Sequence, residues 1–111
     1  MHEFKFKNNY LYCEEMRVLD LVRRYGTPLY VYSYHTLIDH FMKLKNAFSE
    51  IEPLICFSVK ANSNLAILKA LVVKGAGLDI VSGGELFRAI RVGCPAEKIV
   101  YASVGKTDNE I

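Results

Sequence analysis

From Pro28 onward the chain alternates between short apolar runs and longer segments whose apolar residues recur at helical spacing. The apolar runs lie at residues 29–32, 54–59, 78–81 and 99–102, and their centres at 31, 56, 79 and 100 are 25, 23 and 21 residues apart. This alternation predicts parallel strands joined by right-handed helical crossovers, because a tight turn cannot join parallel strands. Continuously apolar strands also indicate a sheet that is covered on both faces.

The connecting segments carry helix start and stop signals. Ser33 is placed to cap one helix, and Asn62 or Ser63 to cap the next. Gly75 and Gly93 mark the points where the second and third helices are expected to end. Four strands with three complete helices make half of a (β/α)₈ barrel, which needs about 250 residues.

The first 27 residues follow a different pattern. Residues 4–7 alternate between polar and apolar like a strand, and residues 13–25 carry apolar side chains at helical spacing. Gly26 is a plausible end for that helix, since glycine readily adopts the left-handed conformation found there.

We therefore predict an α/β fold in which an N-terminal arm and helix over 1–27 precede the N-terminal half of a (β/α)₈ TIM barrel over 28–111. Thr107 and Glu110 have capping-box spacing, which predicts that a fourth helix begins there. The chain is accordingly expected to be a piece of a longer protein and to be inactive alone. The alternative is a small open α/β sheet that is complete in itself.

Composition excludes several classes of function. The net charge of +2 over 111 residues is too small to indicate a nucleic-acid partner. Three cysteines without a CxxC pair predict reduced thiols in the cytoplasm, and three histidines at no metal-ligand spacing predict no metal site. No apolar stretch approaches the ~20 residues that a membrane helix needs.

Lys60 is the first candidate for chemistry. It ends an apolar strand, and active sites of β/α barrels lie at the carboxyl ends of the strands. Partial burial there would lower the lysine pKa from about 10.4 and free the amine to attack an aldehyde. The alternative is a lysine whose ammonium simply extends from the strand end into water.

Two carboxylates accompany Lys60 in this pattern. Asp79 lies inside an apolar strand, where a carboxylate needs a partner, and the neighbouring strand offers Lys60. In the alternative, Asp79 caps the loop that follows. Glu85 has capping-box spacing to Ser82 and is expected to bind the Ser82 amide, with a contact to a substrate amine or to Lys60 as its second role.

Four segments resemble bacterial diaminopimelate decarboxylase. They are YGTPLYVY (25–32), VKANSNL (59–65), GLDIVSGGELFRA (77–89) and VGKT (104–107), and the resemblance covers residues 25–110 in register. Several motifs at matching spacing are far more specific than any one of them. The run Cys56-Phe-Ser58 before Val-Lys departs from the family pattern, in which an aromatic and a small residue are typical, and Ser103 stands where a glycine is common.

The resemblance implies a cytoplasmic homodimer with an alanine-racemase-like barrel (PLP fold type III), in which Lys60 binds pyridoxal 5'-phosphate (PLP) covalently. It implies the decarboxylation of meso-diaminopimelate to L-lysine, the last step of lysine biosynthesis, with Asp79 as an electrostatic partner of Lys60. Residues 1–27 would belong partly to a separate β domain. The alternatives are a sister decarboxylase for ornithine, arginine or carboxynorspermidine, and a non-catalytic PLP-binding homeostasis barrel.

Overall fold

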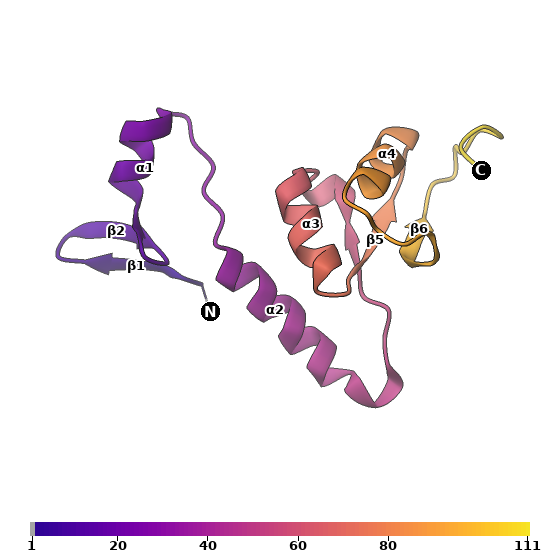
Figure 1. Ribbon diagram of the computed structural model, residues 1–111, viewed down its shortest axis with the longest axis horizontal. Helices are drawn as coiled ribbons and strands as arrows, with labels where there is room; N and C mark the ends of the chain where they lie inside the picture. Colours follow the sequence, from indigo (N-terminus) through magenta and orange to yellow (C-terminus); the bar gives the residue numbers. More distant parts are fainter. Residues whose placement is uncertain (1) are drawn as a thin grey trace. The chain divides into compact units, whose positions relative to one another are not determined.

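The computed structural model describes residues 2–111. It contains two compact units, of which the first reaches to Lys43 and the second covers Leu44–Ile111 (Figure 1). No helix within residues 2–111 is long and apolar enough to cross a bilayer.

The first unit contains an antiparallel sheet of three short strands in the order β1-β2-β3, which are Phe4–Lys7, Tyr10–Cys13 and Met16–Arg17. Asn8 and Asn9 join β1 to β2 with φ of 50° and 64°, the two-residue turn that matches strand twist and favours asparagine. Helix α1 (Val18–Tyr25) follows, and the Gly26 N–H donates to the Val22 oxygen at 2.8 Å.

The predicted helix over 13–25 is therefore wrong in its first part. Cys13 ends β2 and pairs with Met16 of β3, and Glu14 turns the chain between them with φ of 55°. Helical spacing of apolar residues did not reveal this turn, which interrupts the periodic stretch. The predicted strand at 4–7 and the helix end at Gly26 are confirmed.

The predicted strand at 29–32 is also wrong, because these residues form no ladder with any strand among residues 2–111. Tyr30 is 85% exposed and Tyr32 55% exposed, whereas Leu29 and Val31 are half-buried, so the run is only partly covered. A β-prone run becomes a strand only where a partner offers backbone hydrogen bonds. The parallel sheet consequently begins with the strand that precedes Lys60.

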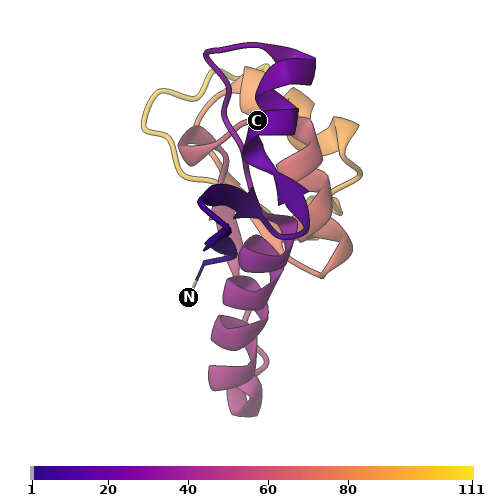
Figure 2. The same cartoon turned by 90° about the vertical axis from the view of Figure 1, so that its left-hand side faces the viewer.

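Helix α2 (Tyr34–Ala47) is continuous over 14 residues (Figure 2). The expected cap is confirmed, since the Ser33 hydroxyl accepts a hydrogen bond from the Thr36 N–H at 3.0 Å. Glu14 strengthens this cap by accepting from the Ser33 hydroxyl and from the His35 N–H, both at 2.8 Å. These hydrogen bonds lower the pKa of the Glu14 carboxyl, the His35 amide contributing most.

The second unit is built on three parallel strands in the order β4-β5-β6, which are Cys56–Ser58, Gly77–Ile80 and Ile99–Tyr101. Helix α3 (Leu65–Val73) joins β4 to β5, and α4 (Gly83–Arg91) joins β5 to β6. Short 3₁₀ helices cover Ser49–Ile51, Val59–Ala61 and Ala96–Lys98. The three later predicted strands and the helices between them are thus confirmed.

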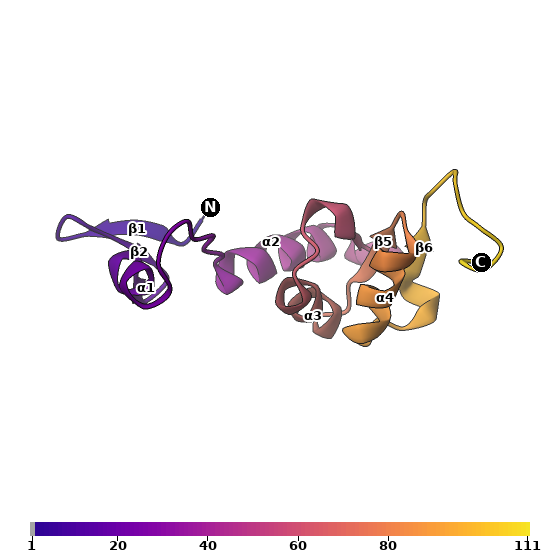
Figure 3. The same cartoon turned by 90° about the horizontal axis from the view of Figure 1, so that it is seen from above.

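The core lies between the sheet and its two crossover helices, which pack on the same side of β5 (Figure 3). Its members are the buried residues Val59, Leu68, Leu78, Ile80, Ala89, Val92 and Cys94. Residues in register across a parallel sheet share a face, so the row Ser58, Asp79 and Val100 points away from this core. One face of the sheet is therefore apolar and covered by helices, and the other carries a carboxylate.

Gly77 allows the strands to approach at the start of β5. A Cβ at this position would lie 2.5 Å from the Lys98 oxygen and 2.7 Å from the Cys56 sulfur, so no larger residue fits without a shift. Close backbone approach is a common reason for glycine inside a strand.

Residues 108–110 form a turn, and the Ile111 N–H donates to the Thr107 carbonyl at 3.2 Å with the spacing of a first helical turn, so the predicted fourth helix remains a prediction. The Thr107 hydroxyl donates to Glu110 Oε2 at 2.9 Å, whereas an N-cap hydroxyl would accept from the Glu110 N–H. The Glu110 N–H donates to the Thr107 carbonyl at 3.0 Å, and the Glu110 side chain accepts from the Thr107 N–H at 2.9 Å, which is one of the two hydrogen bonds of a capping box.

Candidate functional site

Lys60 lies in the 3₁₀ helix Val59–Ala61, directly after β4. Val59 is fully buried in the core and fixes this turn, while Lys60 is exposed. Its ammonium makes no hydrogen bond or ion pair within residues 2–111. The expected position near the strand end is correct. The expected partial burial is not seen, because the chain leaves the sheet after Ser58 and Lys60 is exposed to solvent.

Lys60 lines an open cavity of about 650 Å³ at the carboxyl ends of the strands. The start of α3 and the start of α4 supply the other lining residues, which are Ser63, Leu65, Ser82, Gly84, Glu85, Phe87 and Arg88. The Arg88 guanidinium donates to the backbone carbonyl oxygen of Ser63 at 3.1 Å and so links the two segments. Lys60 and Glu85 are thus brought to one cavity, and Asp79 is not among its lining residues.

Both helices that begin at this cavity have side-chain caps. Asn64 caps α3 by accepting from the Ala66 N–H at 2.9 Å, one or two residues later than the predicted cap at Asn62 or Ser63. Ser82 caps α4 by accepting from the Glu85 N–H at 3.3 Å, as predicted. Capped helix starts direct N–H groups and the positive end of the helix dipole toward this region.

The Glu85 side chain binds a different amide from the one expected. Its Oε2 accepts from the Val81 N–H at 2.8 Å, and the predicted partner was the Ser82 N–H. The carboxylate reaches one residue further back because Ser82 is fully extended, with φ of −155° and ψ of 159°. Glu85 therefore ties the start of α4 to the end of β5.

Asp79 lies on the sheet face opposite the helices and is half-buried. Its Oδ2 accepts from the Ser58 hydroxyl at 3.2 Å, while Oδ1 is buried and has no hydrogen-bond partner within residues 2–111. The expected Asp79–Lys60 pair is not observed in this part of the chain. The reason is geometric, since Ser58 is the residue opposite Asp79 and Lys60 has already left the ladder.

Glu110 is a residue that the sequence pattern did not reveal as part of this region. Its Oε1 accepts from the Gly83 N–H and the Tyr101 hydroxyl, both at 2.8 Å, and Oε2 accepts from the Thr107 N–H at 2.9 Å. These bonds, with the Thr107 amide first, lower the pKa of the Glu110 carboxyl to about 2. The capping-box pattern indicated the local contact with Thr107, but it carries no information about Gly83.

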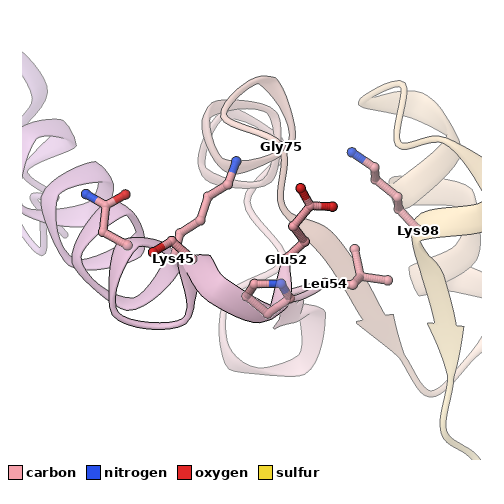
Figure 4. Close-up of a pocket in the computed structure, with 8 residues that line it drawn as sticks. Lys45, Glu52, Leu54, Gly75 and Lys98 are labelled. Atoms are coloured by element: carbon pink, nitrogen blue, oxygen red, sulfur yellow. The ribbon is translucent and has the colours of Figure 1, made fainter.

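A second cavity, of about 480 Å³, lies at the opposite end of the same strands (Figure 4). Its lining comes from the end of α2 and from the segments that lead into β4, β5 and β6. These residues are Lys45, Asn46, Ser49, Glu52, Pro53, Leu54, Gly75 and Lys98. In Figure 4 the amines of Lys45 and Lys98 extend from opposite sides, and the Glu52 carboxylate lies between them.

Residues 34–111 match the family described as pyridoxal-dependent decarboxylase, pyridoxal binding domain. The chain belongs to this family. Its pyridoxal-binding segment includes the whole parallel sheet, both cavities and all three residues that the sequence singled out.

Individual relatives agree with this assignment. The chain is 46% identical over 101 residues to diaminopimelate decarboxylase of Neisseria meningitidis serogroup A, covering 91% of the chain and 25% of that protein. It is 45% identical over 111 residues to the Haemophilus influenzae enzyme of the same name, covering 100% of the chain and 27% of that protein. The predicted resemblance is confirmed, and the chain spans about a quarter of the length of these relatives.

A solved structure extends the likeness to three dimensions. Diaminopimelate decarboxylase from M. jannaschii in complex with L-lysine matches with a TM-score of 0.91 at 33% identity, covering 96% of this chain and 26% of that one. That enzyme therefore shares with this chain the arrangement of its strands and helices.

The residues around Lys60 fit a pyridoxal group. Covalent binding of an aldehyde needs an amine that is accessible and not held in an ion pair, and Lys60 meets both conditions within residues 2–111. The cavity of about 650 Å³ falls within the range of about 300–1,000 Å³ typical of small-molecule sites. Polar groups from two helix starts line it alongside Leu65 and Phe87.

Proposed function

We propose that this chain supplies the PLP-binding lysine, Lys60, of an enzyme that converts meso-diaminopimelate to L-lysine by decarboxylation. One observation carries the proposal: in a pyridoxal-binding domain, Lys60 is the lysine that follows a parallel strand and lines the cavity at its carboxyl end. The names of the relatives favour diaminopimelate over ornithine, arginine or carboxynorspermidine as substrate. They also favour an enzyme over a non-catalytic PLP-binding homeostasis protein.

Each residue of the site has a task that follows from its chemistry. When bound, PLP supplies an electron-poor ring that takes up the electron pair released as carbon dioxide departs. Lys60 holds the cofactor, and its Nζ can carry a proton once a substrate amine has displaced it. Glu85 keeps the start of α4 attached to β5, so that Ser82 and Arg88 remain beside the lysine.

Asp79 has a separate task on the other face of the sheet. Its buried Oδ1 is an acceptor for an amine N–H, which would make Asp79 the electrostatic partner of a cationic group in the complete site. This task requires further strands to enclose that face. The sheet β4-β5-β6 would then be part of the first half of a (β/α)₈ barrel with Asp79 in its interior, as in the alanine-racemase-like fold.

The whole protein would be a cytoplasmic homodimer in which residues 1–27 contribute to a separate β domain and residues 28–111 to the barrel. The three-stranded antiparallel sheet of residues 4–17 supports a β domain. Helix α2 spans the point where the two compact units meet, after Lys43, so the division at residue 27 remains a prediction.

The test is substrate turnover by the purified full-length protein loaded with PLP. We expect carbon dioxide release from meso-diaminopimelate at a kcat/KM about 100-fold above that for ornithine or arginine, because leaving one buried polar group of the site without its partner costs about 1–3 kcal/mol. Replacement of Lys60 by alanine should abolish it, while replacement of Lys74, an exposed lysine at the end of α3, should not. PLP binding without release of carbon dioxide from any of these amino acids would support the homeostasis protein instead.

A further inference from the structure

The Ser58–Asp79 pair joins the strand that precedes Lys60 to the neighbouring strand. The two residues are directly opposite one another in the β4–β5 ladder, and the Ser58 hydroxyl donates to Asp79 Oδ2 at 3.2 Å. Ser58 is the last residue of β4 and directly precedes Val59 and Lys60. Alanine at this position would fit the strand equally well but could not donate a hydrogen bond.

The two oxygens of the Asp79 carboxylate are in different situations. Oδ2 is satisfied by Ser58, whereas Oδ1 is buried without any hydrogen-bond partner within residues 2–111. A buried carboxylate oxygen without a donor is unfavourable, and proteins retain such atoms where a ligand or another group completes them. The hydroxyl therefore fixes which of the two oxygens remains available.

Neighbouring groups on the same face do not supply the missing donor. Cys56 lies two residues before Ser58 on β4, and burial followed by the Asp79 charge raises the pKa of its thiol. The protonated thiol adds no second negative charge beside Asp79, but it does not donate to Oδ1, which has no hydrogen-bond partner within residues 2–111. Val100, opposite Asp79 on β6, has no polar group. Asp79 is thus the one negative charge in this row of the sheet.

We propose that Ser58 is a positioning residue: its hydroxyl holds the Asp79 carboxylate so that Oδ1 accepts a hydrogen bond from an amine in the complete site. The amine is the side chain of Lys60 or the amino group of the substrate, which share the same N–H chemistry. This inference rests on the proposed function, because only that function brings an amine to this face. Ser58 itself touches neither cofactor nor substrate.

The test is a double-mutant cycle in the full-length protein with Ser58→Ala, Asp79→Asn and the two combined, and with Ser58→Thr as the conservative variant. The PLP dissociation constant is measured by absorbance, and kcat and KM are measured separately. Ser58→Ala should raise either the PLP dissociation constant or KM about tenfold, the size expected for one hydrogen bond to a charged group. Ser58→Thr should restore the value of the parent protein. In the Asp79→Asn background, Ser58→Ala should have no further effect.

The pattern of change identifies the amine. A raised PLP dissociation constant with unchanged KM indicates Lys60, and a raised KM with unchanged PLP binding indicates the substrate amine. Equal effects of Ser58→Ala in both backgrounds, or no effect in either, would overturn the inference while leaving the proposed function intact. A parent protein that binds no PLP would overturn both, and thermal unfolding of each variant shows that the compared proteins are folded.

Discussion

The two ends of the parallel sheet carry cavities of similar size that are lined by different parts of the chain. At the carboxyl ends, Lys60 lines a cavity of about 650 Å³ beside two capped helix starts. At the amino ends, Lys45 and Lys98 line one of about 480 Å³ that is formed by segments leading into the strands (Figure 4). Lysines and glutamates are present at both ends, so residue type and cavity volume alone do not separate them.

Strand direction separates the two ends. In a parallel sheet every crossover helix begins near the carboxyl ends of the strands, so helix N–H groups and dipoles converge on one end only. Ser82 and Asn64 mark these helix starts beside Lys60. The end near Lys45 has no such convergence, and we expect it to contribute to stability and not to chemistry.

The largest expected difference between the two ends concerns their lysines. Lys60→Ala in the full-length protein should lower decarboxylation by on the order of 10³-fold or more, because the covalent step and the proton carrier are lost together. Lys45→Ala, the matched change at the amino end, should leave kcat/KM within about twofold. Comparable losses in the two variants would show that the chemistry is not confined to the carboxyl end.

The carboxylates provide a second, smaller contrast. Asp79→Ala should lower activity by about 10- to 100-fold, because it removes the acceptor Oδ1 and the charge beside the expected amine. Glu52→Ala removes an exposed carboxylate at the amino end and should have little effect on turnover. Steady-state kinetics measure kcat/KM of both variants against the parent protein. Equal, negligible effects would contradict an active-site role for Asp79.

A third difference should appear in stability instead of activity. Gly77→Ala places a Cβ 2.5 Å from the Lys98 oxygen and should lower the free energy of unfolding by about 1–3 kcal/mol. Gly105→Ala is the control, because nothing lies within 4 Å of a Cβ at that position and its φ is not left-handed. Denaturant unfolding of the two full-length variants measures the effect, and an unchanged midpoint for Gly77→Ala would refute the close approach of the strands.

The smallest expected effect is the pH dependence due to Glu110. The folded-state pKa of about 2 lies below the ordinary value of 4.5, so the carboxylate stabilises the fold above pH 4.5 and this contribution is lost as the pH falls toward 2. Glu110→Gln should therefore lower the melting temperature at pH 7, and the difference from the parent should shrink between pH 4.5 and pH 2. A difference that is constant over this range would show that the charge of Glu110 does not act on Gly83 and Tyr101.

Periodicity predicted the parts of the fold that depend on local sequence. The strands β4, β5 and β6 and the helices between them follow from apolar runs, capping residues and glycine stops, each of which acts over a few residues. The run 29–32 failed because β propensity does not reveal whether a partner strand exists. The segment 13–25 failed because the turn at Glu14 interrupts a pattern that is otherwise helical.

The candidate site divides in the same way. Lys60 and Glu85 were found because strand ends and capping boxes have local signatures, and the cavity brings them together. The Ser58 partner of Asp79 depends on the register between two strands that are 21 residues apart, and the Glu110 contact with Gly83 spans 27 residues. Such long-range partners follow from tertiary structure, which no short motif encodes.

The most direct measurement is the position of the covalent cofactor. The full-length protein is loaded with PLP, reduced with borohydride and digested, and the pyridoxyl label is located by mass spectrometry of the peptides. We expect the label on Lys60, the lysine at the carboxyl ends of the strands. A label on Lys45 or Lys98 at the amino ends, or on Lys69, Lys74 or Lys106, would contradict the assignment of the site.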